Sequence, residues 1–580
     1  MAVVIGALSA GVAYVLLWLI WLITNVTFHH RFTADTTPPL GTPMGNHLGW
    51  ITIFMPVIGA LVVGFMARYG SPKIRGHGIP EALEAILLGR SRIEPKVAIL
   101  KPISTAISLG TGGPFGAEGP IIMTGGAFGS LIAQMFHLTA AERKTLLAAG
   151  AAGGMAAVFA TPIAAVLLAV ELLLFEWRPR SFIPVAVSAS VSAALRVPLL
   201  GAGPVFPGTV HAPLSGSILL AAVIVGIIAG FGSGLVTNLI YGVEDMFAKL
   251  PIHWMWWPAI GAVVVGVGGW LDPRVLGAGY DSIRALLQGQ VIGAALLGLL
   301  IGKAIVWAIA LGSGTSGGVL APLLIIGGAL GAVIGHWLPV GDPALWAMVG
   351  MAAMMGGTMR APFTGVVFTL EATHDLNALP ALLIGCVCAL GVTVLLLRRS
   401  ILTEKLARRG QHITCEYSID PFELLRVGEV MDANPPVAPA TMTVGELSSR
   451  IAQGNTALSK RQGTLLLDAE NNLAGIVTRG DLLKALQQDP TGQRLLVQVG
   501  SSKPIVAYAD EPLNEAINRM LKNNIGRLPV VDRANPRLAV GYIGRSNVMA
   551  ARTRSLEEEE LREGGTFGKF LPIQLRNGAT

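Results

Sequence analysis

Charged residues are scarce in this chain of 580 residues. Asp, Glu, Lys and Arg make up 13% of it, against about 25% in a typical soluble protein, and 52% of its residues are hydrophobic. Cysteine is nearly absent: Cys386, Cys388 and Cys415 form no disulfide framework and no metal-binding spacing with His. This composition excludes an ordinary soluble enzyme.

The chain also lacks a basic stretch interleaved with aromatic residues, so its net charge of +7 does not indicate nucleic-acid binding. The charge follows membrane topology instead. From Met1 to about Leu397 the sequence consists mostly of apolar segments near the length of a membrane span. Directly after the last one comes a basic cluster of Arg398, Arg399, Lys405, Arg408 and Arg409. The positive-inside rule places this end, and the more charged sequence that follows, in the cytoplasm.

The N-terminal segment lacks the basic start and the small-residue cleavage site of a signal peptide. We therefore expect residues 1–23 to form a first membrane helix. The next apolar span, residues 51–66, is followed by Arg68, Lys73 and Arg75. A cytoplasmic start would return the chain to the cytoplasm at that point, as the positive-inside rule requires.

An internal repeat is the most informative feature that is present. Residues 109–132 (LGTGGPFGAEGPIIMTGGAFGSLI) match residues 311–334 (LGSGTSGGVLAPLLIIGGALGAVI) at an offset of 202, and a second block matches from Gly150 to Glu171 and from Gly350 to Glu371 at an offset of 200. The order of the blocks predicts two copies of one membrane unit, residues 1–200 and 201–410. Transporters built this way place the substrate site between the copies, near the bilayer midplane.

The repeated blocks are Gly-rich, Pro-interrupted loops that open helices within apolar sequence. Irregular backbone in a membrane must be buried in protein or line a cavity. Glycine lets backbone N–H groups approach a ligand, and the positive N-terminal end of the following helix points to the same place. Two such ends predict an anion site that needs no buried Lys or Arg. A third loop of this kind is residues 76–80; a dinucleotide-binding fold is not favoured, because no acidic residue follows at the required spacing.

Three of these stretches, GHGIP (76–80), GAEGP (116–120) and GGVLAP (317–322), resemble the anion-selectivity motifs of the CLC chloride channel and transporter family. The resemblance covers about residues 1–410 and implies inverted-topology repeats and a homodimer with one pore per subunit. The family usually has a further helix before its first long span, and both a truncated start and a real absence are open here. The resemblance assigns anion binding to His77, Gly78, Ile79, Gly116, Gly119, Val319 and Leu320.

Glu118 is the candidate gate. An ionisable residue in a membrane segment indicates function by default. The resemblance implies that its carboxylate competes with an anion for the same helix-end site, and that protonation frees the site. A structural acid, hydrogen-bonded in place, is the alternative.

Four positions depart from the family pattern. Ala117 stands where the motif often has Arg, and His77 where chloride-selective members often have Ser; His could donate through a ring N–H or turn away. Leu402 aligns with a pore tyrosine, so that ligand is expected to be lost. Leu172 follows Glu171, where well-coupled proton exchangers have a second Glu, which argues against tight proton coupling. Glu171 and its repeat equivalent Glu371 are expected to be structural.

The charged C-terminal part repeats as well. Residues 437–446 match residues 506–515 at an offset of 69, and the two copies resemble a pair of CBS domains, each a strand set with amphipathic helices. The segment GIVTRGD (475–481) resembles their nucleotide motif and implies Thr478 for phosphate and Asp481 for ribose. In the second copy Asn547 replaces the acid. Binding of an adenine nucleotide (ATP, ADP or AMP) and plain dimer scaffolding are both open.

The predicted fold is therefore an all-α polytopic membrane protein with two inverted-topology repeats, followed by an α/β cytoplasmic tandem CBS domain. The predicted parts are the membrane repeats 1–200 and 201–410, a linker 411–426, CBS domains 427–490 and 491–555, and a C-terminal tail 556–580.

The predicted function is passage of chloride through a pore that is channel-like or weakly coupled. A chloride/proton antiporter and a pore for another small anion, such as nitrate or fluoride, are the alternatives. A magnesium transporter would need more acidic residues facing a pore. An enzyme would need a nucleophile with its base or a metal cluster, and neither pattern occurs in the membrane part. No catalytic or metal-binding residue is assigned.

Overall fold

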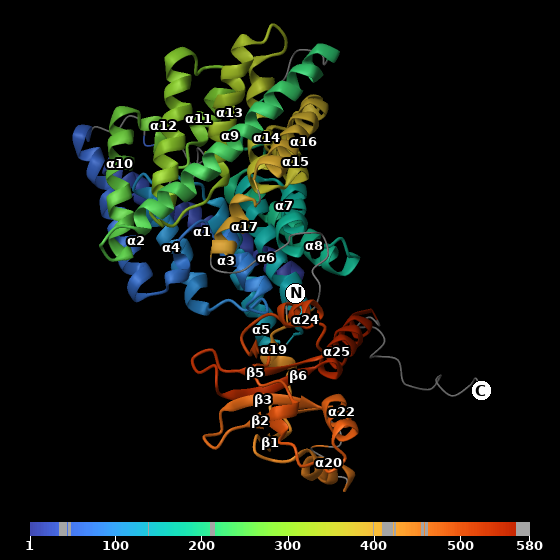
Figure 1. Cartoon of the computed structure of the whole chain (residues 1–580). Helices are drawn as coiled ribbons and strands as arrows, with labels where there is room; N and C mark the ends of the chain where they lie inside the picture. The colour runs from blue at the N-terminus through green and yellow to red at the C-terminus, as the bar shows by residue number, and fades with distance from the viewer. Residues whose placement is uncertain are drawn as a thin grey trace. The chain divides into compact units, whose positions relative to one another are not determined.

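The computed structural model (Figure 1) describes residues 1–33, 43, 48–136, 138–208, 215–397, 399–408, 422, 425–453, 458 and 462–563, with side chains as far as residue 554. Arg398, Arg409, Cys415 and most of the predicted linker lie outside the described residues. The chain divides into two compact units, Met1–Ser418 and Ile419–Thr580, which we call the membrane unit and the tail unit.

The membrane unit consists of helices in two matching series. The first series is α1 (Ala2–Thr24), α2 (Phe54–Tyr69), α3 (Ile79–Leu87), α4 (Pro95–Gly110), α5 (Glu118–Met135), α6 (Ala140–Phe159), α7 (Pro162–Leu168) and α8 (Pro179–Leu200). The second series is α9 (Gly216–Ala248), α10 (Trp257–Leu271), α11 (Tyr280–Leu287), α12 (Gly293–Gly312), α13 (Leu320–Trp337), α14 (Pro343–Met359), α15 (Pro362–Thr373) and α16 (Leu379–Leu396), followed by α17 (Ile401–Arg408). The one-to-one order confirms the predicted repeat.

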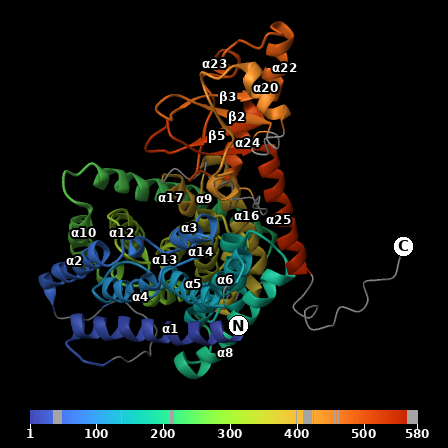
Figure 2. The same ribbon diagram turned by 90° about the horizontal axis from the view of Figure 1, so that it is seen from below.

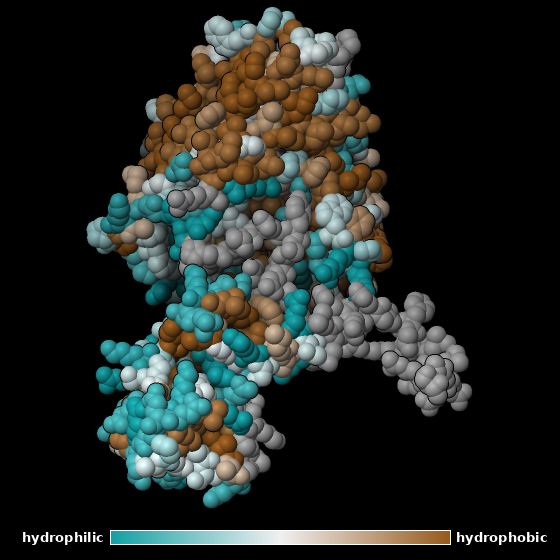
Figure 3. Space-filling model, turned by 45° about the vertical axis from the view of Figure 1, so that its right-hand side comes forward, coloured by the Kyte–Doolittle hydropathy of each residue, from teal (hydrophilic) through white to brown (hydrophobic). Residues whose placement is uncertain are grey.

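The outer surface of the membrane unit suits lipid. Among the described residues, eight helical segments are long and apolar enough to cross a membrane, including the predicted first span. Figure 3 shows a broad apolar surface on the face of the unit in view. Large apolar side chains are exposed along α9, α10 and α12, for example Leu220, Phe231, Val263 and Ile301. In water such a surface would be strongly unfavourable, whereas in a bilayer it needs no cover.

Several helices are too short to cross the membrane and end inside the unit. Helices α3 and α11 have 9 and 8 residues, and a full span needs about 20. The loops that precede α5 and α13 are buried throughout residues 111–117 and 315–319. The short helices therefore bring irregular backbone into the interior, as predicted from the Gly-rich blocks.

Paired glycines allow the long helices to pack closely within each repeat. A Cβ atom on Gly150 of α6 would lie 2.0 Å from the carbonyl oxygen of Gly125 of α5, and the equivalent atom on Gly350 of α14 would lie 2.2 Å from that of Gly327 of α13. Backbone therefore packs directly against backbone at the same place in both repeats.

The tail unit contains two copies of one small α/β fold. The first copy contains β1 (Val437–Pro439), α20 (Val444–Ala452), β2 (Gly463–Leu467), β3 (Leu473–Thr478) and α22 (Arg479–Gln488), and α23 (Leu496–Val499) packs against it. The second contains β4 (Ala507–Tyr508), α24 (Leu513–Lys522), β5 (Arg527–Val531), β6 (Ala539–Gly544) and α25 (Arg545–Glu563), and α19 (Val427–Val430) packs against it.

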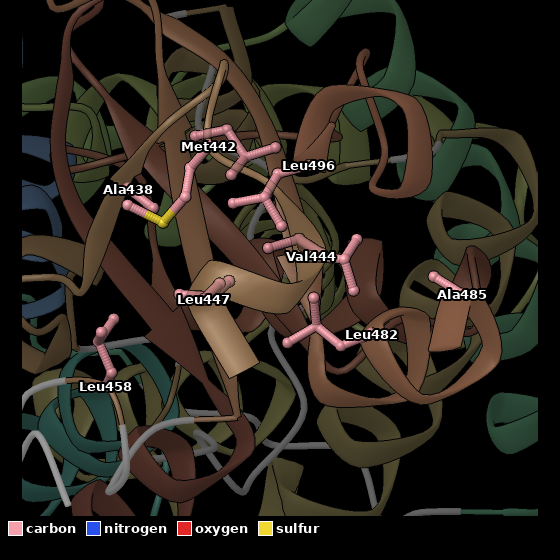
Figure 4. Close-up of a cluster of buried hydrophobic side chains, with 10 residues drawn as sticks. Ala438, Met442, Val444, Leu447, Leu458, Leu482, Ala485 and Leu496 are labelled. Atoms are coloured by element: carbon pink, nitrogen blue, oxygen red, sulfur yellow. The ribbon is translucent and has the colours of Figure 1, made fainter. Parts of the chain in front are cut away.

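The two sheets have the same topology. The first strand is parallel to the second, the second is antiparallel to the third, and the register shifts at equivalent points, after Leu466 and after Val530. Leu447 and Leu496 lie with Val444 and Leu482 in the apolar core that α20 and α22 form with the first sheet (Figure 4). Strand order and core confirm the predicted tandem repeat.

The glycine pairs generate a stability prediction. We expect Gly150→Ala to lower the free energy of unfolding by about 1–3 kcal/mol, because a well-packed interface must shift to admit the methyl group. Gly298→Ala in α12 is the matched control, since no atom lies within 4 Å of its Cβ position and alanine is the better helix former. Thermal unfolding of the two variants in detergent measures the difference; equal midpoints would contradict the packing.

Candidate functional site

Backbone hydrogen bonds join the three loops of the candidate site. The N–H of Gly76 donates to Thr315 O at 3.1 Å, and Gly318 N–H donates to Gly116 O at 2.8 Å. The loops before α3 and α5, from the first repeat, are thus tied to the loop before α13, from the second. Figure 2 shows α3, α5 and α13 in the middle of the membrane unit. Their N-termini lie close together, so the positive ends of three helices gather in one region.

Glycine is required where these backbones touch. A Cβ atom on Gly119 would lie 1.8 Å from His77 O, and one on Gly78 would lie 2.6 Å from Gly119 O. Gly78 also has a φ of 91°, which side chains of L-residues rarely tolerate. The two helix starts can therefore meet only because neither residue has a side chain.

Glu118 lies at the first position of α5 and is fully buried. Its carboxylate packs against Gly116 and Gly318, and a Cβ atom on Gly318 would lie 2.8 Å from Oε2. The backbone N–H groups of Glu118 itself and of Ala321, in the first turn of α13, interact with the same carboxylate. An acidic group thus occupies the point where the starts of α5 and α13 meet, which is where a small anion would be stabilised.

Tyr280 is a contact of Glu118 that the sequence did not reveal. It is the first residue of α11, and its hydroxyl donates to Glu118 Oε1 at 3.2 Å. A signal existed, since Gly279–Tyr280 matches Gly78–Ile79 at an offset of 201, between the two offsets of the repeat blocks. A tyrosine at the repeat equivalent of a predicted anion-site residue could have been noticed.

Two buried lysines near the candidate site were not predicted from the sequence. Lys101 and Lys303 are both fully buried and occupy equivalent places in α4 and α12. Lys101 Nζ donates to Ile74 O at 2.8 Å and to Gly76 O at 2.7 Å. Each lysine thus holds the loop that precedes a short helix, Lys101 before α3 and Lys303 before α11. The two lysines are 202 residues apart, which is the repeat offset. They were not predicted, because they lie outside the glycine blocks.

The predicted anion residues lie at the starts of the three helices. Ile79 and Leu320 are the first residues of α3 and α13, and Val319 precedes α13; all three are fully buried. The structure thus brings together the residues that the three motifs supply. Whether their N–H groups bind an anion stays a prediction.

A cavity of about 350 Å³ opens beside His77. Arg75 and Lys405 also line it, and Lys405 Nζ forms an ion pair with Glu81 Oε1 at 2.8 Å. One acidic residue, Glu244, lines the cavity as well, so cationic side chains outnumber acidic ones in its lining and favour anions there.

Leu402 of α17 stands where the family pattern has a pore tyrosine. It is 1% exposed, and a leucine side chain cannot donate to an ion. The adjacent Ile401 O accepts a hydrogen bond from Tyr241 of α9, which lines the same cavity. A tyrosine hydroxyl therefore does lie beside the cavity, but it comes from α9 and not from α17.

Glu171 and Glu371 each cap a helix of the opposite repeat. Glu171 accepts hydrogen bonds from the N–H of Phe363 at 3.2 Å and of Thr364 at 2.8 Å, at the start of α15. Glu371 accepts from Ile163 N and Ala164 N, at the start of α7. Each carboxylate caps the helix of the other repeat, which agrees with the structural role expected for both. Leu172 is buried and offers no titratable group.

The candidate nucleotide residues cap helices in the tail unit. Thr478 Oγ1 donates to Asp481 Oδ2 at 2.7 Å, and Asp481 N–H donates back to Thr478 Oγ1 at 3.3 Å, at the start of α22. Asn547 Oδ1 accepts from Gly544 N–H at 3.0 Å, and its Nδ2 donates to Val430 O. These contacts show a local structural role; nucleotide binding stays a prediction.

Fold and site together define a multi-pass membrane protein with helix starts gathered in its interior, an arrangement suited to a small anion. Comparison with known proteins identifies the family: a model described as voltage gated chloride channel matches residues 59–394. A CBS domain model matches twice, at residues 427–488 and 497–554. The chain belongs to the CLC chloride channel and transporter family and carries a CBS pair. It is a multi-pass membrane protein for chloride transport rather than an enzyme, and its CBS pair is cytoplasmic.

Relatives and solved structures agree with this assignment. The "Voltage-gated ClC-type chloride channel ClcB" of Citrobacter koseri is 30% identical over 404 residues, which is 67% of this chain and 94% of that protein. The "H(+)/Cl(-) exchange transporter ClcA" of Cronobacter sakazakii is 30% identical over 60% of this chain and 77% of that protein. The structure of a slow cyanobacterial Cl⁻/H⁺ antiporter shares the fold, with a TM-score of 0.63 at 24% identity over 70% of this chain and 96% of that one.

The buried lysines generate a second stability prediction. We expect Lys101→Met to lower the free energy of unfolding by about 2 kcal/mol, because two buried carbonyl groups lose their donor. Lys73→Met is the control: Lys73 pairs with Glu94 at the surface, where its side chain is 58% exposed, and such pairs contribute about 0–1 kcal/mol. Thermal unfolding in detergent compares the two variants. Equal losses would show that Lys101 does not hold the loop.

Proposed function

We propose that this protein passes chloride through a pore that the carboxylate of Glu118 closes. The position of that carboxylate, between the starts of α5 and α13, is the observation that carries the proposal. A carboxylate and a chloride ion cannot both occupy one small site that is stabilised by the same N–H groups. Protonation removes the negative charge and weakens the competition, which frees the site for the anion.

The anion path that we propose runs from this site to the cavity beside His77. We call it the inner cavity, because Arg75 and Lys405 line it and belong to basic clusters that the positive-inside rule places at the cytoplasmic side. The ligands of the path are supplied by His77, Gly78, Ile79, Gly116, Gly119, Val319 and Leu320. Because His77 lines the cavity through which anions would enter, we assign it a place at the inner end of the path. The proposed assembly is a homodimer in a lipid membrane with one such path in each subunit. The proposed domain boundaries are those expected from the sequence.

The proposed flux is uncoupled from protons or only weakly coupled. Leu172 occupies the position after Glu171, where a second carboxylate would receive a proton from the inside in well-coupled relatives. Glu171 is held at the start of α15 by two N–H groups and by Thr364 Oγ1, which keeps it in a structural contact. The chloride/proton exchanger remains the second candidate, because the relatives include one protein named as an exchanger.

The gate prediction concerns pH dependence. In proteoliposomes, chloride efflux through the unaltered chain is expected to rise as the pH falls, because protonated Glu118 leaves the site. Glu118→Gln carries no charge at any pH, so its efflux should be high and independent of pH. Efflux of nitrate and fluoride measured alongside reports the selectivity. A Glu118→Gln variant with the unaltered pH profile would exclude the gate.

The coupling prediction concerns the reversal potential. Under a tenfold chloride gradient we expect a reversal potential of about 59 mV, the value for one charge, whether or not a pH gradient is added. An exchanger would instead show a potential displaced towards the proton equilibrium potential when the pH gradient is imposed. Such a displacement would favour the second candidate and leave the pore itself unaffected.

A further inference from the structure

Tyr280 is the side chain that donates to Glu118 in the part of the chain that the structure describes. Its hydroxyl lies 3.2 Å from Glu118 Oε1, and both residues are buried, at 2% and 0% exposure. Hydrogen bonds to charged acceptors are roughly twice as strong as those between neutral groups. The hydroxyl therefore favours the charged carboxylate in its place between α5 and α13.

The ring of Tyr280 is held on two sides. The Phe206 ring packs against it edge-on at 5.2 Å between centroids, and the Phe159 ring packs at 5.9 Å. Phe159 is fixed in turn by Phe368, whose ring lies 5.1 Å away. An aromatic side chain enclosed in this way has little freedom, so its hydroxyl stays directed at one point.

The backbone before Tyr280 is fixed as well. Lys303 Nζ donates to Val275 O at 3.0 Å and to Gly277 O at 2.9 Å. Gly277 N–H donates to Gly112 O, in the segment that leads to α5. The loop that carries Tyr280 is thus tied both to α12 and to the segment that carries Glu118, which fixes the distance between the two residues.

Among the residues that the structure describes, Lys303 is the charged side chain that acts electrostatically on Glu118. The other charged groups around the site are engaged elsewhere. Lys101 of α4 donates to carbonyl groups before α3, Glu81 of α3 pairs with Lys405, and Arg143 of α6 donates to Arg90 O and Leu138 O. The stability of the carboxylate in its site thus depends on Tyr280, on Lys303 and on the N–H groups at the two helix starts.

We propose that Tyr280 is a positioning residue that holds the Glu118 carboxylate in the anion site and sets the pH at which it leaves. This inference rests on the proposed gate at Glu118 and goes beyond it. The hydroxyl binds the charged carboxylate more strongly than the protonated one, because a neutral acid is a weaker acceptor. Loss of the hydroxyl would therefore let the side chain leave at a higher pH.

Tyr280→Phe tests this inference, since it removes only the hydroxyl and keeps the enclosed ring. Chloride efflux from proteoliposomes is measured against pH for the unaltered chain, Y280F, E118Q and the double variant. We expect the midpoint of the efflux profile to move up by about one pH unit in Y280F, the size of one hydrogen bond to a charged group. In the E118Q background Y280F should change nothing, because the group it acts on is no longer charged.

Ser192→Ala is the control. Ser192 of α8 is also buried, and its hydroxyl donates to Gly153 O at 2.6 Å, a contact that does not involve Glu118. Its removal should leave the midpoint of the pH profile where it is. A midpoint that Y280F leaves unmoved, while E118Q abolishes pH dependence, would overturn the inference and retain the gate. Persistent pH dependence in E118Q would overturn the gate itself. An equal effect of Y280F with and without Glu118 would show that the hydroxyl acts on another group.

Discussion

Irregular backbone inside a membrane must find its hydrogen-bond partners within the protein, because lipid offers none. Here the loops before α3, α5 and α13 satisfy one another across the two repeats, as the pair between Gly116 and Gly318 shows. A glycine at each contact lets the chains approach to a distance that any Cβ atom would prevent. The same contacts bring three positive helix ends together, so the arrangement that satisfies the backbone also forms the place where we propose that an anion binds.

The two buried lysines extend this principle to the short helices. Each uses its ammonium group to satisfy two carbonyl oxygens before α3 or α11, and the equivalence follows from the repeat. What comes next in the chain differs. After the loop held by Lys303 comes Tyr280, which contacts Glu118, whereas the loop held by Lys101 carries His77 beside the inner cavity. The same contact between a buried lysine and two carbonyl groups therefore holds two loops that differ in chemistry, because one leads to Tyr280 and the other carries His77.

The sequence predicted much of this fold, because its strongest signals are physical. Apolar span length and the ordered glycine blocks predicted the membrane repeats, and the matching tail segments predicted the two small sheets. The site was predicted where motif and repeat coincide, at Glu118 and at the helix starts. Tyr280, Tyr241 and Lys303 were not predicted, because their roles depend on packing between segments far apart in the chain. Lys303 did have a signal, since it is a charged residue within the apolar segment 293–312, but the sequence does not show that it bonds to backbone carbonyls.

The distribution of ionisable groups bears on proton coupling. An exchanger needs a proton to reach the gate from the inside through groups that can take it up and release it. In the described structure Glu118 is enclosed by Tyr280 and two helix starts, Glu171 is engaged in a helix cap, and Leu172 is apolar. These contacts support the proposal of a gate that responds to pH and to anion occupancy without obligatory proton exchange.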